Sequence, residues 1–166
     1  MSALTMADCP ALVEHLKDKE ISDFTLAIPF PYQLSGAEWF VNFTQQRKEK
    51  LKHNRDWAIR KADGELIGVI SFVGDVSRKN IYSAEIGYWL AKKYWGVGIM
   101  SNSVNALCSL AFKEHKYVRL EAPVFAHNIG SQRVLEKCGF ELEGRLKRAY
   151  YKNENFFDSL LYAKVI

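Results

Sequence analysis

The pattern of apolar and polar residues divides the chain into segments with two different periodicities. Six segments are rich in aromatic and β-branched residues and are predicted as strands: 55–61, 65–73, 82–90, 117–125, 140–151 and 156–165. Four segments carry apolar residues at helical spacing: 8–17, 35–52, 99–112 and 128–137. This order of elements predicts an α/β (α+β) domain, a mixed sheet with helices on both faces.

Turn residues support this division. Ala62-Asp63-Gly64 between two strand segments predicts a hairpin. Ser35 and Glu38 have the spacing of a capping box and predict the start of the second helix. Pro123 inside a strand predicts a sheet edge or a splayed strand end, because proline cannot donate to a ladder. The polar segment 74–80 is predicted as a turn.

Two glycines connect the strand 82–90 to the helix that follows it. Gly96 and Gly98 lie directly before Ile99, where the helical spacing begins. Such a loop presents unpaired N–H groups at the positive end of a helix dipole, which predicts an anion site, with phosphate as the usual anion. A P-loop needs Lys-Ser/Thr after its second glycine, and a dinucleotide fingerprint needs a third glycine at Ser101, so both alternatives fail.

A second segment, 126–144, narrows the choice of phosphate ligand. Together the two segments resemble the GNAT superfamily of N-acetyltransferases, most closely its RimJ/RimL-like branch of protein N-terminal acetyltransferases. The matching residues are Glu85-Ile86-Gly87-Tyr88-Trp89-Leu90, Trp95-Gly96-Val97-Gly98-Ile99-Met100, Asn128 with Ser131 and Arg133-Val134-Leu135-Glu136-Lys137, and Gly139-Phe140 with Glu143-Gly144. The resemblance extends over about residues 56–166.

The resemblance implies the GNAT acyl-CoA N-acyltransferase fold, with a mostly antiparallel sheet splayed between its fourth and fifth strands. The pantetheine arm of acetyl-CoA would pair with the main chain of Tyr88, Trp89 and Leu90. N–H groups of the loop Trp95, Gly96, Val97, Gly98, Ile99 and Met100 would bind the diphosphate. Asn128 would hold a pantetheine amide, although helix capping suits it equally well. Ser131 and Arg133 complete the implied cofactor set, Arg133 reaching the adenosine phosphates or remaining a solvated charge.

Transfer of an acetyl group to an amine requires a base for the amine and a proton for the departing thiolate. Glu85 is the candidate base, acting through water, and a salt-bridged surface Glu is the alternative. Many members of the superfamily place a Tyr where this chain has Leu135, so Ser131 is the candidate donor here, with a helix cap as its alternative. Tyr150 and Tyr151 are secondary candidates for the rim of the pocket. Trp39, Phe40 and Phe43 give the second predicted helix an aromatic face, which is predicted to pack in the core, with a wall of the acceptor pocket as the alternative.

Composition agrees with a single domain over residues 1–166. The chain is 48% hydrophobic and 25% charged, and its net charge of +4 is spread along the sequence. Its three cysteines lack metal spacing and predict reduced thiols, and neither a signal peptide nor a membrane segment is apparent. We expect a cytoplasmic monomer or homodimer, with no metal and no direct contact with nucleic acid.

The acceptor is less constrained than the donor, because a fold does not determine its substrate. The resemblance favours acetyl transfer from acetyl-CoA, in a ternary complex, to a protein or peptide N-terminal amine. One alternative is a small-molecule amine or antibiotic acetyltransferase. Another is an acyl-CoA-binding sensor that retains the cofactor site without turnover.

Overall fold

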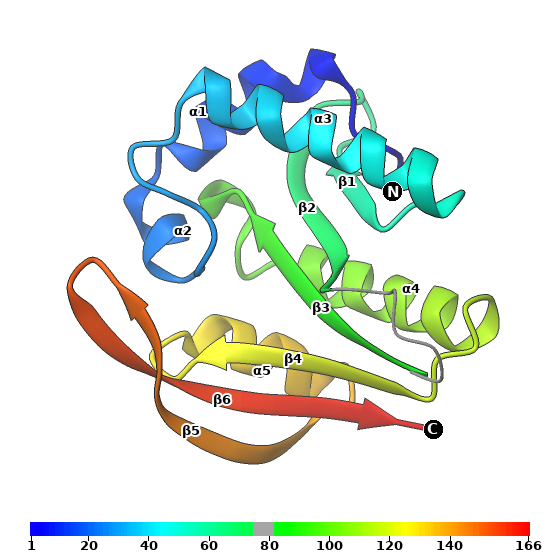
Figure 1. The fold of residues 1–166 in the computed structure, drawn as a ribbon, viewed down its shortest axis with the longest axis vertical. Coiled ribbons are helices and arrows are strands. Elements are labelled where there is room, and N and C mark those ends of the chain that lie inside the picture. The colour runs from blue at the N-terminus through cyan, green and yellow to red at the C-terminus, as the bar shows by residue number, and fades with distance from the viewer. Residues whose placement is uncertain (75–81) are drawn as a thin grey trace. The chain divides into compact units, whose positions relative to one another are not determined.

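A computed structural model describes residues 1–74 and 82–166 of the chain (Figure 1). The helices are α1 (Cys9–Leu16), α2 (Lys19–Asp23), α3 (Leu34–Leu51), α4 (Ile99–Lys113) and α5 (Ile129–Lys137), with short 3-10 turns at Met6–Asp8 and Lys92–Tyr94. The strands are β1 (Asp56–Arg60), β2 (Leu66–Val73), β3 (Ser83–Leu90), β4 (Arg119–Phe125), β5 (Glu141–Lys152) and β6 (Asn155–Val165). Their order in the sheet is β1-β2-β3-β4-β6-β5.

The chain forms two compact units. Unit 1 contains residues 1–71 and 88–97, and unit 2 contains residues 72–87 and 98–166. β3 therefore contributes its first part to unit 2 and its last residues to unit 1. This division determines how the predicted site residues are grouped below.

Unit 1 folds around the helices α1 and α3, which pack side by side (Figure 1). Its core consists of buried apolar side chains from the helices and from β1, β2 and the end of β3: Leu4, Cys9, Leu12, Leu16, Ile21, Ala37, Val41, Ala58, Leu66, Val69 and Trp89. β1 and β2 form the predicted antiparallel hairpin around Asp63-Gly64. Ser2 adds an isolated antiparallel bridge to Ala58 at the other side of β1.

Unit 2 contains the parallel pair of the sheet. β3 and β4 pair in parallel at three positions, the last of which joins Glu85 to Glu121. β6 lies between β4 and β5 and is antiparallel to both (Figure 1). Pro123 pairs with Leu161 of β6 and lies beyond the last β3–β4 pair. β4 is therefore an interior strand whose pairing with β3 ends before Pro123. Of the two alternatives predicted from Pro123, the splayed strand end is confirmed and the sheet edge is wrong.

The helix α3 differs from the prediction in how it starts and what it buries. Its N-cap is Gln33, with an extended backbone and no side-chain cap bond, so the capping box predicted from Ser35 is wrong. The helix buries Ala37, Val41 and Thr44 and leaves Trp39 65% exposed. Core packing of Trp39 is therefore also wrong. The short helix α2 was not predicted, and the turn predicted at 74–80 falls, beyond Gly74, outside the described residues.

Candidate functional site

Three of the predicted cofactor-binding residues, Tyr88, Trp89 and Leu90, form the end of β3 and belong to unit 1. Trp89 and Leu90 are buried there, and Ala91 donates its N–H to the carbonyl of Ile67 on β2 at 2.8 Å. The two strands approach closely because β2 has a glycine at this point. A Cβ on Gly68 would lie 2.6 Å from the carbonyl oxygen of Trp89. Only glycine allows this approach, so β2 fixes the main chain at the end of β3.

The loop after β3 folds back onto the strand through Trp95. The indole Nε1 of Trp95 donates to the carbonyl of Leu90 at 2.7 Å, and its ring lies 6.1 Å from that of Phe24. Gly96 follows with φ of +80°, a backbone conformation that favours glycine, and has open space where a Cβ would stand. The side chain of Val97 is exposed. The predicted loop residues are thus held by Trp95 at one end.

Two lysines precede this loop and have carboxylate partners in unit 1. Lys92 pairs with Glu20 of α2 at 2.5 Å, and Lys93 approaches Glu65 at 3.5 Å. Both lysine side chains are more than half exposed. These pairs make the lysines part of the surface charge balance of unit 1 rather than a cation cluster.

Gly98 is the first of the predicted cofactor-binding residues that belong to unit 2, and it is the N-cap of α4. Its φ is +84°, it supplies no side-chain cap, and nothing lies within 4 Å of where its Cβ would be. The first N–H groups of a helix, here beginning with Ile99 and Met100, have no acceptor within the helix. Met100 is buried, which anchors this turn. The structure therefore has the glycine-headed helix end that the sequence predicts.

Asn128 is the N-cap of α5, as its alternative role predicts. Its Oδ1 accepts from the backbone N–H of Ser131 at 3.0 Å. Ser131 is half-buried in the first turn, whereas Arg133 is exposed. Leu135, at the position where a Tyr donor occurs in similar enzymes, is fully buried. The first turn of α5 thus brings Asn128 and Ser131 together.

Glu85 is half-buried on β3 beside Glu121, its register partner on β4. Burial raises the pKa of Glu85, and the nearby carboxylate of Glu121 raises it further. Glu121 in turn accepts from Arg119 Nε at 2.6 Å, and the guanidinium of Arg119 also pairs with Glu143 of β5. A carboxyl with a raised pKa holds a proton at a higher pH, which favours acid–base chemistry near neutrality.

The sequence analysis missed Arg119 and Glu121. Arg119 lies 24 positions from Glu143 in the sequence, and the register of three strands brings the charged groups together. Hydrogen bonds to Glu143 and to Glu121 raise the pKa of Arg119, so the guanidinium stays charged. The alternation of charged residues on β4 was the only sequence signal for this network.

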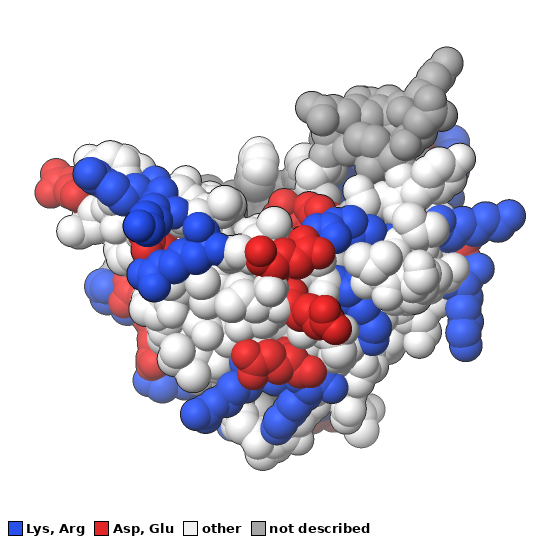
Figure 2. Space-filling model, turned by 90° about the horizontal axis from the view of Figure 1, so that it is seen from below, with Lys and Arg blue, Asp and Glu red and all other residues white. Residues whose placement is uncertain are grey.

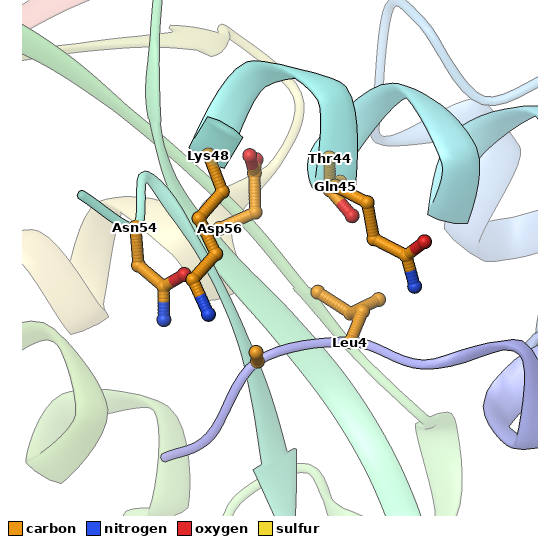
Figure 3. A pocket seen from close by; sticks show the side chains of 7 residues that line it. Leu4, Thr44, Gln45, Lys48, Asn54 and Asp56 are labelled. Carbon is orange, nitrogen blue, oxygen red and sulfur yellow. The ribbon is translucent and has the colours of Figure 1, made fainter. Parts of the chain in front are cut away.

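Unit 1 contains a small cavity whose lining includes none of the predicted site residues. It is lined by residues from the N-terminal segment, α3, the connection after α3 and β1: Ala3, Leu4, Thr44, Gln45, Lys48, Asn54 and Asp56 (Figure 3). Burial raises the pKa of Asp56, although a hydrogen bond with Ser71 and the charge of Arg47 oppose this shift. Nη2 of Arg47 lies 3.3 Å from the Asp56 carboxylate. We interpret this group as a buried ion pair that joins α3 to β1.

Within residues 1–74 and 82–166, no three His, Cys, Asp or Glu side chains are grouped so that they could hold a metal ion. All three cysteines are free and buried, and burial raises the pKa of Cys108 to about 11. In the same part of the chain, no helix is long and apolar enough to cross a bilayer.

Comparison with known proteins assigns a family to these features. Residues 1–141 match the family described as "Acetyltransferase (GNAT) domain", a range that contains every predicted catalytic and cofactor-binding residue. A probable N-acetyltransferase of Bacillus subtilis, YjcK, is 38% identical over 113 residues, which cover 68% of this chain and 62% of that protein. The ribosomal-protein-serine acetyltransferase of Escherichia coli is 39% identical over 118 residues, covering 69% of this chain and 64% of that protein.

A solved structure agrees over nearly the whole chain. The ribosomal L7/L12 α-N-protein acetyltransferase RimL, solved in complex with coenzyme A, superposes with a TM-score of 0.83 at 25% identity. The match covers 99% of this chain and 92% of that one. The matched segment spans slightly under two thirds of the length of the two curated relatives.

Proposed function

This chain belongs to the GNAT acetyltransferase family, and we propose that it transfers an acetyl group from acetyl-CoA to the N-terminal amine of a protein or peptide. The relatives support the acceptor class. One is named a ribosomal-protein-serine acetyltransferase and another an α-N-protein acetyltransferase. The observation that carries the proposal is the uncapped, glycine-headed N-terminus of α4 within the family match.

The N-terminus of α4 fits the diphosphate of acetyl-CoA. An anion there would accept from backbone N–H groups of Ile99 and Met100, at the positive end of the helix dipole. The open space at Gly98 and Gly96 would let phosphate oxygens approach the main chain, which a Cβ would obstruct. Each charge-assisted hydrogen bond of this kind contributes about 1.5–3 kcal/mol. Arg133, exposed on α5, would contribute a charge to the adenosine phosphates.

The end of β3 fits the pantetheine arm. β3 continues to Leu90, beyond its last pairing with β4 at Glu85. As the resemblance to GNAT enzymes implies, the main chain of Tyr88, Trp89 and Leu90 would line the extended amide arm. Asn128, whose Oδ1 caps α5, would hold a pantetheine amide, as the resemblance implies.

The acceptor class determines how much the base must do. An α-amine with a pKa near 7.8 is about 14% neutral at pH 7, whereas a lysine with a pKa near 10.4 is only about 0.04% neutral. A single carboxylate acting through water therefore suffices for an N-terminal amine. Glu85 is the proposed base, because burial and Glu121 raise its pKa toward neutrality.

The remaining steps follow from the bonds that change. The neutral amine nitrogen attacks the thioester carbonyl, the carbon–sulfur bond breaks, and the departing sulfur takes up one proton while the new amide loses one. We assign the proton donor to the Ser131 hydroxyl, which the cap from Asn128 holds in the first turn of α5. Glu85 accepts the proton that the amine loses and releases it to solvent water, from which Ser131 regains the proton that it gave to the sulfur.

Release of free thiol with a panel of amines tests the proposal. We expect turnover with peptides that carry a free α-amine, and no turnover with the same peptides after their N-termini are blocked. Turnover confined to small-molecule amines would contradict the protein acceptor. Acetyl-CoA binding without release of thiol from any amine would contradict catalysis and support a sensor.

A further inference from the structure

The indole of Trp95 closes the turn that leads from β3 into the proposed diphosphate loop. Its Nε1 donates to the carbonyl of Leu90 at 2.7 Å, and its backbone N–H donates to the carbonyl of Lys92 at 3.0 Å. The side chain and the main chain of one residue thus both bind the segment that this residue ends. A turn held in this way has little conformational freedom left to lose when a ligand binds beyond it.

The carbonyl that Trp95 uses points away from β2. Ala91 donates its N–H to the carbonyl of Ile67 on β2 at 2.8 Å. Successive residues of a strand direct their N–H and C=O groups to opposite sides, so Leu90 directs its groups to the side opposite β2. The indole N–H therefore serves the Leu90 carbonyl as a neighbouring strand would, and it ties the loop to the end of β3.

The short helix α2 also contacts the indole. Phe24, the C-cap of α2, has its ring 6.1 Å from that of Trp95 at an angle of 42°, which is a favourable contact between aromatic rings. α2 is itself held in place, because Ile21 is buried in the core of unit 1 and the hydroxyl of Ser22 donates to the carbonyl of Ile28 at 2.8 Å. Trp95 is thus held by the end of a strand and by a helix that the sequence pattern did not predict.

Charge contributes little to this arrangement. Lys92 pairs with Glu20 of α2 at 2.5 Å, but the two side chains are 53% and 40% exposed, and exposed ion pairs stabilise weakly. Charges are mixed elsewhere on the surface too: Figure 2 shows acidic side chains gathered in a band through the middle of one face, with Lys and Arg on both sides of it. An anion gains less from mixed charges than from a basic patch. The placement of backbone N–H groups therefore carries more of the affinity for a diphosphate.

We propose that Trp95 is a positioning residue for acetyl-CoA: it fixes the direction in which the loop leaves β3 and so orders the N–H groups of Gly96 and Val97 before the coenzyme binds. This inference rests on the proposed function, because it adds a residue that acts on the coenzyme through the loop. Groups that are ordered in advance lose less entropy on binding, which raises the affinity without a contact between Trp95 and the coenzyme. Removal of the indole N–H should therefore weaken binding of acetyl-CoA and leave the chemical step unchanged.

Trp95→Phe tests the inference, because it keeps a ring beside Phe24 and removes the N–H donor. Amide hydrogen exchange, followed by mass spectrometry in the absence of coenzyme, measures the order of residues 91–97, and we expect faster exchange there in the variant. Calorimetric titration should show an affinity for acetyl-CoA that is about three- to tenfold weaker, the effect of one neutral hydrogen bond. The kcat at saturating acetyl-CoA should remain that of the unchanged protein.

Three further variants show whether the effect belongs to this bond. Tyr82→Phe removes one donor from a ring that is 61% exposed, and both exchange and affinity should stay unchanged. Glu20→Gln removes the exposed ion pair with Lys92 and should change the affinity less than about twofold. Phe24→Leu leaves Trp95 intact and removes only the ring contact, so it should speed exchange of the same segment less than Trp95→Phe does, which protects the test if Trp95→Phe folds poorly.

Weaker binding by Trp95→Phe with unchanged exchange in the coenzyme-free protein would overturn the proposal, because Trp95 would then act by direct contact with the coenzyme. A lower kcat with unchanged affinity, or equal changes in Trp95→Phe and Tyr82→Phe, would overturn it too. Failure of the proposed function is distinguishable from these results. In that case the unchanged protein would bind no acetyl-CoA, whereas a failure of the positioning role alone leaves this binding intact.

Discussion

Replacing Gly98 with alanine separates the proposed diphosphate site from the stability of the fold. Gly98 has φ of +84°, and nothing lies within 4 Å of the position of an added Cβ. The substitution therefore creates no clash within the protein and costs only the left-handed backbone conformation, about 1 kcal/mol. Because natural domains are stable by about 5–15 kcal/mol, the variant should remain folded.

The effect on acetyl-CoA should be larger than the effect on stability. The new methyl group would stand at the head of α4, where phosphate oxygens are proposed to approach the main chain. Loss of one charge-assisted hydrogen bond costs about 1.5–3 kcal/mol, which weakens the affinity about 10- to 150-fold. Calorimetric titration with acetyl-CoA and with CoA measures this change, and thermal unfolding measures the cost to the fold.

Gly64→Ala provides a matched control. Gly64 has φ of +91° and equally open surroundings, but it lies in the β1–β2 turn. We expect both variants to lose about the same stability and only Gly98→Ala to lose affinity. Unchanged affinity of Gly98→Ala, at an equal loss of stability in both variants, would refute the assignment of the diphosphate to α4.

Three further substitutions test the other assigned roles. Glu85→Gln should lower turnover about a hundredfold or more without changing acetyl-CoA affinity. Burial and Glu121 raise the pKa of Glu85 in the folded protein, so ionisation of Glu85 above about pH 4.3 lowers the free energy of unfolding. The variant should therefore melt at a higher temperature than the unchanged protein at pH 7 and at the same temperature at pH 4. Asn128→Ala should lose about 1 kcal/mol of stability in urea unfolding, and Asn128→Asp should restore the cap but not the acetyl-CoA affinity; full affinity in both would leave Asn128 with capping alone. Burial would raise the pKa of Asp8, but hydrogen bonds from Arg60 lower it, so Asp8→Asn should cost about 1.5–3 kcal/mol at pH 7 and progressively less below about pH 3.9; a cost independent of pH would contradict this ion pair.

Most elements of the fold could be predicted from local patterns. The Asp63-Gly64 turn defined the first hairpin, and the spacing after Gly98 defined α4. The start of α3 could not be predicted, because Ser35 and Gln33 both precede the helical pattern and only the backbone distinguishes them. The five-residue helix α2 is too short to show a period.

Burial of Trp39 and Phe43 on α3 was wrong because two stripes of this helix have helical spacing. Ala37, Val41 and Thr44 form the stripe that is buried, whereas Trp39 and Phe43 stack on each other at 5.3 Å outside it. Their sizes favour the aromatic stripe as core, but of the predicted aromatic face only Phe40 is packed against the core of unit 1. Sequence spacing gives the angle between the two stripes and not the side on which the core lies.

The local geometry of the candidate site was predicted in part. Motif spacing located Gly98 and Asn128 at helix N-termini, because capping is a local property of the chain. The carboxylate pair of Glu85 and Glu121 depends on strand register, and no local pattern specifies which residues of β3 and β4 face each other. The bond from the Trp95 indole to the Leu90 carbonyl likewise depends on how the chain folds back, which no spacing specifies.

Tandem mass spectrometry of an acetylated peptide tests the central claim most directly. The purified chain is incubated with acetyl-CoA and a peptide that carries both a free α-amine and an internal lysine. We predict one acetyl group on the α-amine, formed only when the enzyme and acetyl-CoA are both present. An acetyl group on the lysine alone, or no acetylated product in the presence of saturating acetyl-CoA, would contradict the proposed activity.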